Sequence, residues 1–136
     1  MSLLEDYIKD CFGEERMIEI IDLGGTESFW KTFKTPITDR ANITLVNLTY
    51  QNVTEPNFKS IIGNACRLPQ FTKNQFDLVF SNSVIEHVGN FEKQKEMANE
   101  IKRIGKYYFI QTPNQYFFLE PHFLLPFFQF LNNFFN

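Results

Sequence analysis

The sequence predicts an α/β domain in which a mostly parallel sheet of about five strands carries helices on both faces. Short apolar runs rich in β-branched residues recur along the chain, and a segment with helical periodicity precedes the last of them. The run Met17–Leu23 ends at the pair Gly24-Gly25, where a strand can turn into a helix. Strands that alternate with helices favour a parallel sheet, because the crossover helices cover both of its faces.

The first helix is expected to end at Gly13. Ser2 and Glu5 form a capping-box pattern, and apolar residues repeat at helical spacing from Leu4 to Cys11. The elements expected after it and before residue 90 are a strand at Met17–Leu23, a helix at Ser28–Phe33, a strand at Ile43–Leu48, a short helix end with a third strand within Phe58–Gly63, and a fourth strand at Phe76–Phe80.

The period changes again at Phe91. Apolar residues between Met97 and Ile104 share one helix face, charged residues take the other, and Gly105 ends this helix. A fifth strand is expected at Tyr107–Gln111. Without a further neighbour, that strand would present an open edge that can pair with another chain. The phenylalanine-rich C-terminal segment, a second copy of the chain, or further residues if the chain is a fragment could cover it, and self-association or marginal solubility is expected.

The composition indicates a globular domain, with 43% hydrophobic and 21% charged residues. No repeat or linker interrupts residues 1–136, which are expected to form one domain. A net charge of -3 argues against a nucleic-acid partner, because a surface that follows phosphates carries excess positive charge. Cys11 and Cys66 lack metal-ligand spacing, and Glu5 and Asp6 interrupt the N-terminal apolar run, so a protein of the reducing cytoplasm is expected.

Asp22 and the glycines that follow it are the first candidate site. Paired glycines at the end of a strand leave backbone N–H groups in a crevice, where a phosphate, a carboxylate or a nucleoside can bind. The Asp22 carboxylate suits a cationic ligand group such as an α-ammonium; the alternative is a helix cap or a turn residue. Because the loop reads GGTESF rather than G-x-G-x-x-G, a nicotinamide-dependent enzyme is the weaker alternative.

Asn47 is the second candidate. It ends the second expected strand about 20 residues beyond the glycines, where nucleoside-binding sheets place an acid for the ribose hydroxyls. Its amide oxygen also accepts a hydrogen bond from a hydroxyl, less strongly than a carboxylate does. The alternative is that Asn47 satisfies a turn at the end of the strand.

Three segments occur in a specific order: DLGG at 22–25, GNACRLP at 63–69 and FDLVFSNSVIEHV at 76–88. In this order and at these intervals, the chain resembles the class I S-adenosylmethionine-dependent methyltransferases, in particular the group often called type 11. The resemblance extends from Met17 to about Asn114. It implies a Rossmann-like fold and S-adenosylmethionine as cofactor. It also implies a C-terminally short chain that lacks the last two strands of the full methyltransferase fold.

The resemblance also implies a role for each turn. The acid and glycines hold the methionine moiety, the end of the second strand binds the ribose, the segment after the third strand lies along the adenine edge, and the end of the fourth strand closes beside the amino group. The predicted cofactor-binding residues are Asp22, Gly24, Gly25, Thr26, Asn47, Leu48, Asn64, Ala65, Ser81 and Asn82. The chain departs from the family pattern where Thr26 and Ser28 replace glycines and where Asn47 and Asn64 replace acids. These departures bear on cofactor affinity more than on the fold.

Glu86 and His87 follow the fourth strand. Some methyltransferases that this segment resembles carry an E-x-x-E-H frame that binds a divalent metal. The first position here is Ser83, so one carboxylate ligand is absent and no metal is expected. His87 is the predicted catalytic base, because its unperturbed pKa of about 6.5 suits removal of a proton from a hydroxyl acceptor. The alternative is a cap on the loop before the helix at Phe91.

The C-terminal segment 116–136 is rich in phenylalanine. Glu120, Pro121 and Pro126 interrupt it well short of the ~20 apolar residues that span a bilayer, so no transmembrane helix is expected. Two interpretations remain open. The segment packs on the sheet and forms an acceptor pocket, or it contacts a lipid surface or a partner, which would give a peripheral membrane contact or a homo-oligomer.

Together, these observations favour a cytoplasmic S-adenosylmethionine-dependent methyltransferase that acts on a small molecule, or on a lipid or glycan precursor. The alternative is a non-catalytic fragment of methyltransferase fold that acts as a cofactor-binding or interaction module. The missing strands and the replaced acids are the features that favour this alternative.

Overall fold

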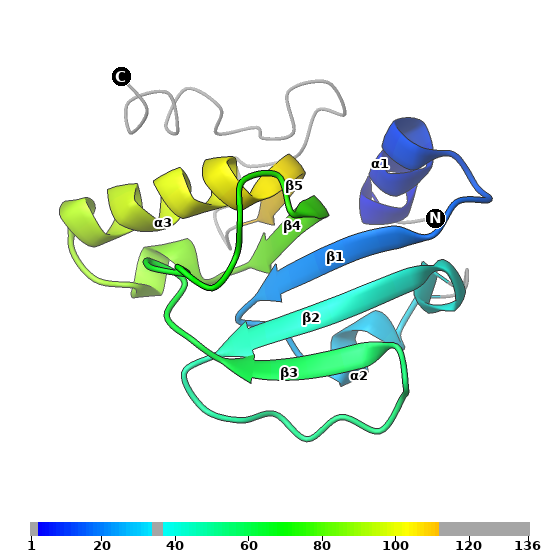
Figure 1. Cartoon of the computed structure of the whole chain (residues 1–136), viewed down its shortest axis with the longest axis horizontal. Helices are drawn as coiled ribbons and strands as arrows, with labels where there is room; N and C mark the ends of the chain where they lie inside the picture. The colour runs from blue at the N-terminus through cyan, green and yellow to red at the C-terminus, as the bar shows by residue number, and fades with distance from the viewer. Residues whose placement is uncertain (1–2, 34–36, 112–136) are drawn as a thin grey trace.

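The computed structural model describes residues 3–33 and 37–111. Within these ranges, five strands form one sheet in the order β3-β2-β1-β4-β5, and every neighbouring pair is parallel. The strands are β1 (Ile18–Leu23), β2 (Ala41–Asn47), β3 (Phe58–Ile62), β4 (Phe76–Asn82) and β5 (Gly105–Gln111). Figure 1 shows the strands side by side with their carboxyl ends at one edge of the sheet. The predicted parallel α/β fold is therefore confirmed.

Helix α1 (Leu3–Phe12) covers one face of the sheet. It buries Leu4, Tyr7, Ile8 and Phe12, which recur at helical spacing. The Tyr7 ring lies 5.3 Å from that of Phe109 in β5, measured between ring centroids. The helix ends as predicted at Gly13, whose φ of +73° favours glycine and whose N–H donates to the Lys9 carbonyl.

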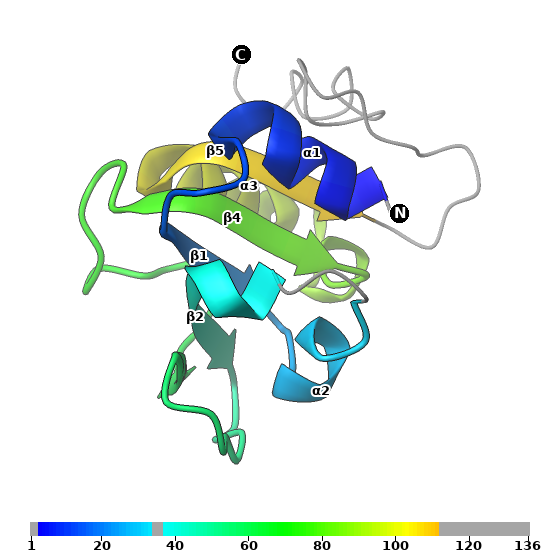
Figure 2. The same ribbon diagram turned by 90° about the vertical axis from the view of Figure 1, so that its right-hand side faces the viewer.

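Helix α3 (Phe91–Ile104) lies on the other side of β4 and β5 from α1, as Figure 2 shows. The Asn90 side chain caps it by accepting a hydrogen bond from the Lys93 N–H at 3.0 Å. Gly105 ends the helix as predicted. Unlike Gly13, it has an extended backbone and starts β5 directly. A Cβ at this position would overlap the side chain of Val79 in β4, so only glycine lets the helix approach the sheet so closely.

Two local predictions were wrong in detail. The segment from Phe58 contains no helix end; it is a strand from its first residue because it pairs with β2 from Ile43 onward. Helix α2 (Glu27–Trp30) is one turn long and stops before Phe33. The short elements η1 (Ile37–Arg40) and η2 (Ile85–His87) were not predicted, and neither shows an apolar period in the sequence.

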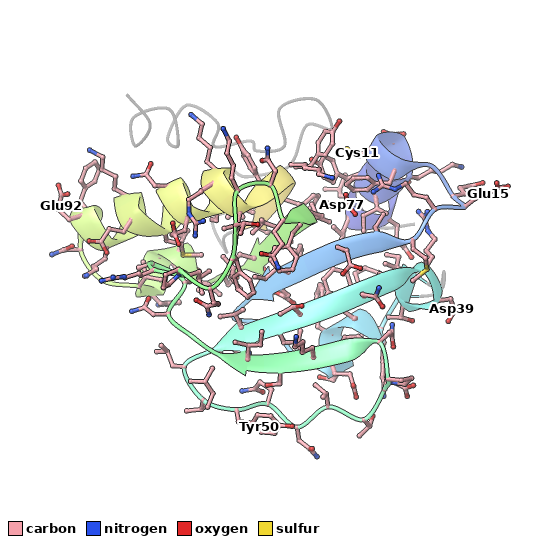
Figure 3. The ribbon with its side chains drawn as sticks, in the orientation of Figure 1. Cys11, Glu15, Asp39, Tyr50, Asp77 and Glu92 are labelled. Atoms are coloured by element: carbon pink, nitrogen blue, oxygen red, sulfur yellow. The ribbon has the colours of Figure 1, made fainter. Side chains whose placement is uncertain are left out.

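Asp77 joins three strands at the amino edge, opposite the ends that Figure 1 marks with arrowheads (Figure 3). Its carboxylate accepts hydrogen bonds from the Glu19 N–H at 2.9 Å, from Arg16 at 2.8 Å and from Lys106 at 3.3 Å. Burial raises the pKa of Asp77, but these donors outweigh burial and hold the pKa below its ordinary value. This edge of the sheet therefore contains a satisfied buried charge.

Several predictions concern residues outside the described ranges. They include Ser2 of the capping box, the phenylalanine-rich segment 116–136 and the expected lack of two further strands after β5, so these stay predictions. None of the helices within 3–33 and 37–111 has the length and apolar character needed to cross a bilayer.

Candidate active site

The candidate site lies at the carboxyl edge of the sheet. The strand order reverses about β1, which has β2 on one side and β4 on the other, and open parallel sheets bind ligands at such a point. A cavity of about 420 Å³ lies there, within the range of small-molecule pockets. Its lining comes from the turns after β1, β2 and β3 and from the region around η2: Gly24, Val46, Asn47, Leu48, Thr49, Gly63, Asn64, Ala65, Val84, His87 and Val88.

The glycine loop after β1 depends on two close approaches. Gly24 has a φ of +86° and donates its N–H to the Val46 carbonyl at 2.7 Å. A Cβ on Gly24 would lie 2.5 Å from Cγ2 of Val84, and a Cβ on Gly25 would overlap the carboxyl group of Asp22. Glycine is therefore required at both positions, at Gly24 by conformation and space and at Gly25 by space alone.

Asp22 lies beneath this loop and does not line the cavity. The residue is only 1% exposed, and its Oδ2 accepts a hydrogen bond from Nε1 of Trp30 at 2.8 Å. Oδ1 is buried and has no hydrogen-bond partner. Burial raises the pKa of Asp22 to about 7, and the Trp30 N–H limits the rise. A buried carboxylate oxygen without a partner is a candidate acceptor for a cationic donor, because buried polar atoms are normally paired.

The hydrogen bonds of Asn47 give a reason for an amide, rather than an acid, at the end of β2. The side-chain Nδ2 of Asn47 donates to the Gly25 carbonyl at 2.9 Å, and the backbone carbonyl of Asn47 accepts from the Gly63 N–H at 2.8 Å. A carboxylate has no hydrogen to donate, so aspartate could not hold the glycine loop in this way. The amide oxygen remains as an acceptor. The next residue, Leu48, is 76% exposed and lines the cavity.

Asn64 and Ala65 form the turn after β3. The Asn64 Oδ1 accepts from the Cys66 N–H at 2.9 Å, and an isolated bridge pairs Asn64 with Arg67. The side chain thus closes its own turn, as short polar side chains commonly do. Ala65 is half-buried beside the cavity.

Thr26, Ser81 and Asn82 lie outside the cavity lining. Thr26 is the N-cap of α2, where its Oγ1 accepts from the Phe29 N–H at 3.4 Å. Ser81 is fully buried and donates from Oγ to the Leu23 carbonyl at 3.0 Å. Asn82 is exposed at the end of β4, and its Oδ1 is 3.1 Å from the Ser83 hydroxyl. Ser81 and Thr26 thus hold the two sides of the loop after β1, whereas the Asn82 side chain contacts its neighbour Ser83.

His87 lines the cavity from η2, with 76% of its side chain exposed. Its Nε2 lies 3.7 Å from Oε1 of Glu86, whose two carboxylate oxygens are buried and have no hydrogen-bond partner. The N-cap of α3 is Asn90. The alternative in which His87 caps the loop before this helix stays a prediction. In the part of the chain that the structure describes, no three His, Cys, Asp or Glu side chains are grouped to hold a metal ion. That no metal binds stays a prediction.

Residues 25–107, more than half of the chain, match the family described as methyltransferase domain. The chain belongs to this family. A sequence comparison with curated proteins found no match.

Several solved structures share the fold. A SAM-dependent methyltransferase from Methanosarcina mazei is 15% identical with a TM-score of 0.60, over 81% of this chain and 56% of that one. A protein assigned as a methyltransferase of an antibiotic biosynthesis pathway in Anabaena variabilis is 15% identical with a TM-score of 0.58, over 79% and 44% of the two chains. The YcgJ protein of Bacillus subtilis is 16% identical with a TM-score of 0.56, over 79% and 49%. The chain thus spans about half the length of these structures.

The cavity brings together six of the residues predicted from sequence: Gly24, Asn47, Leu48, Asn64, Ala65 and His87. Asp22 and Gly25 lie directly beneath or beside them. Sequence reasoning missed Glu27, Trp30 and Val84. Each contacts a residue far along the chain or across a turn, so only the folded backbone reveals its role.

Glu27 holds the β2–β3 loop beside the cavity. Its carboxylate, 10% exposed, accepts hydrogen bonds from the Thr54 N–H at 2.9 Å, the Thr54 hydroxyl at 2.7 Å and the Glu55 N–H at 3.1 Å. Lys31 lies 3.1 Å away on the same helix. Burial raises the pKa of Glu27, but the Thr54 and Glu55 donors outweigh it and lower the pKa to about 2.

Glu27→Gln is expected to lower the melting temperature by a few degrees at pH 7. The folded-state pKa lies below the unfolded value, so the carboxylate stabilises the fold above about pH 4.5. This stabilisation is lost as the pH falls toward 2, and the gap between variant and wild type narrows. Thermal unfolding at pH 7 and pH 3 checks this, with the exposed Glu55→Gln as the matched control on the same loop. An equal gap at both pH values would contradict the assignment.

Proposed function

We propose that this chain is an S-adenosylmethionine-dependent methyltransferase that transfers a methyl group to a small-molecule, lipid or glycan-precursor acceptor in the cytoplasm. The observation that carries the proposal is the cavity at the carboxyl edge, beside an orphaned buried oxygen of Asp22, in a chain of the methyltransferase domain family. A nucleoside with a cationic amino-acid tail matches both features.

Different residues around the cavity would bind different parts of the cofactor. The amide oxygen of Asn47 would accept from a ribose hydroxyl, while Leu48 and Ala65 offer apolar contact beside the adenine. The glycine loop, with Asp22 below it, would hold the amino-acid portion. Asn64, Thr26, Ser81 and Asn82 shape the turns around these contacts.

In methyl transfer, the main contribution of the protein is to position the acceptor. The bound cofactor supplies a methyl group on a sulfonium, which is already an excellent leaving group. The chain's task is to hold the attacking atom in line in a dry pocket. His87 lines the cavity and is the proposed base, accepting the proton of a hydroxyl acceptor at Nε2. The Glu86 carboxylate nearby would stabilise the imidazolium that forms.

Titration calorimetry with S-adenosylhomocysteine and S-adenosylmethionine tests the proposal directly. We expect saturable heat with both ligands and a rise in melting temperature with S-adenosylhomocysteine. NADH is the control, because the nicotinamide alternative requires it to stabilise the protein instead. Absence of heat at millimolar S-adenosylhomocysteine would overturn the proposal.

A non-catalytic cofactor-binding module is the second candidate. The amides at Asn47 and Asn64, in place of the acids of the family pattern, favour it. Incubating the protein with methyl-labelled S-adenosylmethionine and an extract of its source cells separates the two. Label transferred by the wild type and lost in His87→Ala supports the enzyme. Cofactor binding with no labelled product supports the module.

Self-association through the β5 edge is a further part of the proposal. In residues 3–33 and 37–111, β5 has a strand neighbour on one side, β4. An open strand edge is a template for pairing with a second copy. Light scattering at high protein concentration tests this, and a monodisperse monomer would contradict it.

A further inference from the structure

Trp30 and Asp22 form a buried pair under the glycine loop. The Trp30 Nε1 donates to Oδ2 of Asp22 at 2.8 Å, and Trp30 is 1% exposed. Trp30 is the single tryptophan of the chain. The pair links α2 to the end of β1, directly below the backbone that borders the cavity.

The indole is fixed in place by other aromatic rings. Its centroid lies 5.1 Å from Phe80 in β4, 5.4 Å from Phe29 and 5.8 Å from Phe33. Phe29 stacks on Phe80 at 5.2 Å, so the surrounding rings are themselves packed together. Tight aromatic packing leaves the Nε1–H pointing at one atom, which a solvent-exposed donor would not do.

Only one of the two Asp22 carboxyl oxygens has a hydrogen-bond partner in this pair. Oδ2 is held by Trp30, while Oδ1 is buried without a partner, and Gly25 lies against the carboxyl group. A buried carboxylate with one orphaned oxygen is unfavourable until a donor, above all a cationic one, reaches it. The raised pKa of Asp22 is consistent with this unmet need.

We propose that Trp30 is a positioning residue that holds one oxygen of Asp22 so that the other is presented to the ammonium group of the cofactor. This inference rests on the proposed function. The competing interpretation is that Trp30 is an apolar core residue whose N–H is merely satisfied. The two differ in one respect: only positioning makes the effect of Trp30 depend on the ligand's amino group.

The test compares S-adenosylhomocysteine with its deamino analogue, which keeps the carboxylate and lacks the amino group. Trp30→Phe retains an aromatic ring and removes the N–H. We expect it to weaken S-adenosylhomocysteine about tenfold and to leave the deamino analogue unchanged. Phe29→Leu is the matched control, because it loosens the same ring cluster without touching Asp22, and it should preserve the ratio of the two affinities.

A second measurement needs no variant. The single indole N–H gives one cross-peak in a ¹⁵N–¹H spectrum, so it is assigned without ambiguity. We expect S-adenosylhomocysteine to move this peak more than the deamino analogue does. Equal movement by both ligands, or an equal effect of Trp30→Phe on both affinities, would overturn the inference while leaving the proposed function intact. Failure of the wild type to bind either ligand would instead overturn the proposed function.

Discussion

Gly25→Ala is expected to lower the stability of the protein by about 3 kcal/mol and to abolish binding of S-adenosylhomocysteine. The added Cβ would occupy the space of the Asp22 carboxyl group, which cannot move aside because it is buried and bonded to Trp30. Chemical denaturation and calorimetry measure the two effects.

Two variants sharpen this prediction. Gly13→Ala places a Cβ where nothing lies within 4 Å, at a φ of +73°, so it tests backbone conformation alone and should leave binding unchanged. Asp22→Ala combined with Gly25→Ala removes the group that the new Cβ would overlap, and should be more stable than Gly25→Ala alone. Wild-type stability in Gly25→Ala, or no rescue in the double variant, would contradict the geometry.

Asp22→Asn is expected to stabilise the protein at pH 8 and to weaken S-adenosylhomocysteine about 30-fold or more. The folded-state pKa of Asp22, about 7, lies above its unfolded value of 3.8. The folded state therefore holds the extra proton, and stability falls as the pH rises from about 4 to 7. The full cost of the ionised carboxylate at pH 8 is on the order of 4 kcal/mol.

Thermal unfolding from pH 5 to pH 8.5 checks the Asp22 prediction. The wild type should lose stability across this range, and Asp22→Asn should lose less. Asp77→Asn is the opposite control, because Asp77 is also buried but has three donors and a lowered pKa, so removing its charge should destabilise the protein. A flat wild-type profile would show that Asp22 carries no strained charge.

The two aspartates show how the fold separates stability from function. Asp77, at the amino edge, is satisfied by donors from neighbouring residues and stabilises the sheet. Asp22, at the carboxyl edge, is buried with one oxygen unpaired. A group that costs stability in the absence of ligand is common at functional sites. The contrast therefore supports the carboxyl edge as the place where a ligand binds.

Much of the fold follows from patterns that the sequence makes visible. The continuous apolar run before Gly24 is typical of a buried central strand, which β1 is. The apolar face from Met97 to Ile104 is typical of a helix that packs on a sheet, which α3 is. Gly13 and Gly105 mark helix ends as expected. These elements are governed by local periodicity and glycine, which is why they were predictable.

The site was less predictable because its contacts join distant residues. In the sequence, Asn47 is interpreted as a weaker substitute for the acid that binds the ribose. In the structure, its side-chain amide donates to the Gly25 carbonyl, which an acid could not do. Glu27 reads as an ordinary acid in the first turn of a helix, whereas its partners are Thr54 and Glu55. No spacing rule connects such pairs, since the turns between them set the distance. Sequence therefore located the edge of the sheet but not the bonds that organise it.

The central claim is that a nucleoside cofactor binds the cavity at the carboxyl edge of the sheet. A crystal structure of the protein with S-adenosylhomocysteine tests it most directly. We expect the adenine between Leu48 and Ala65, a ribose hydroxyl on the Asn47 amide oxygen, and the amino group on Oδ1 of Asp22. A ligand ordered elsewhere on the protein, with this cavity empty and Oδ1 still unpaired, would contradict the claim.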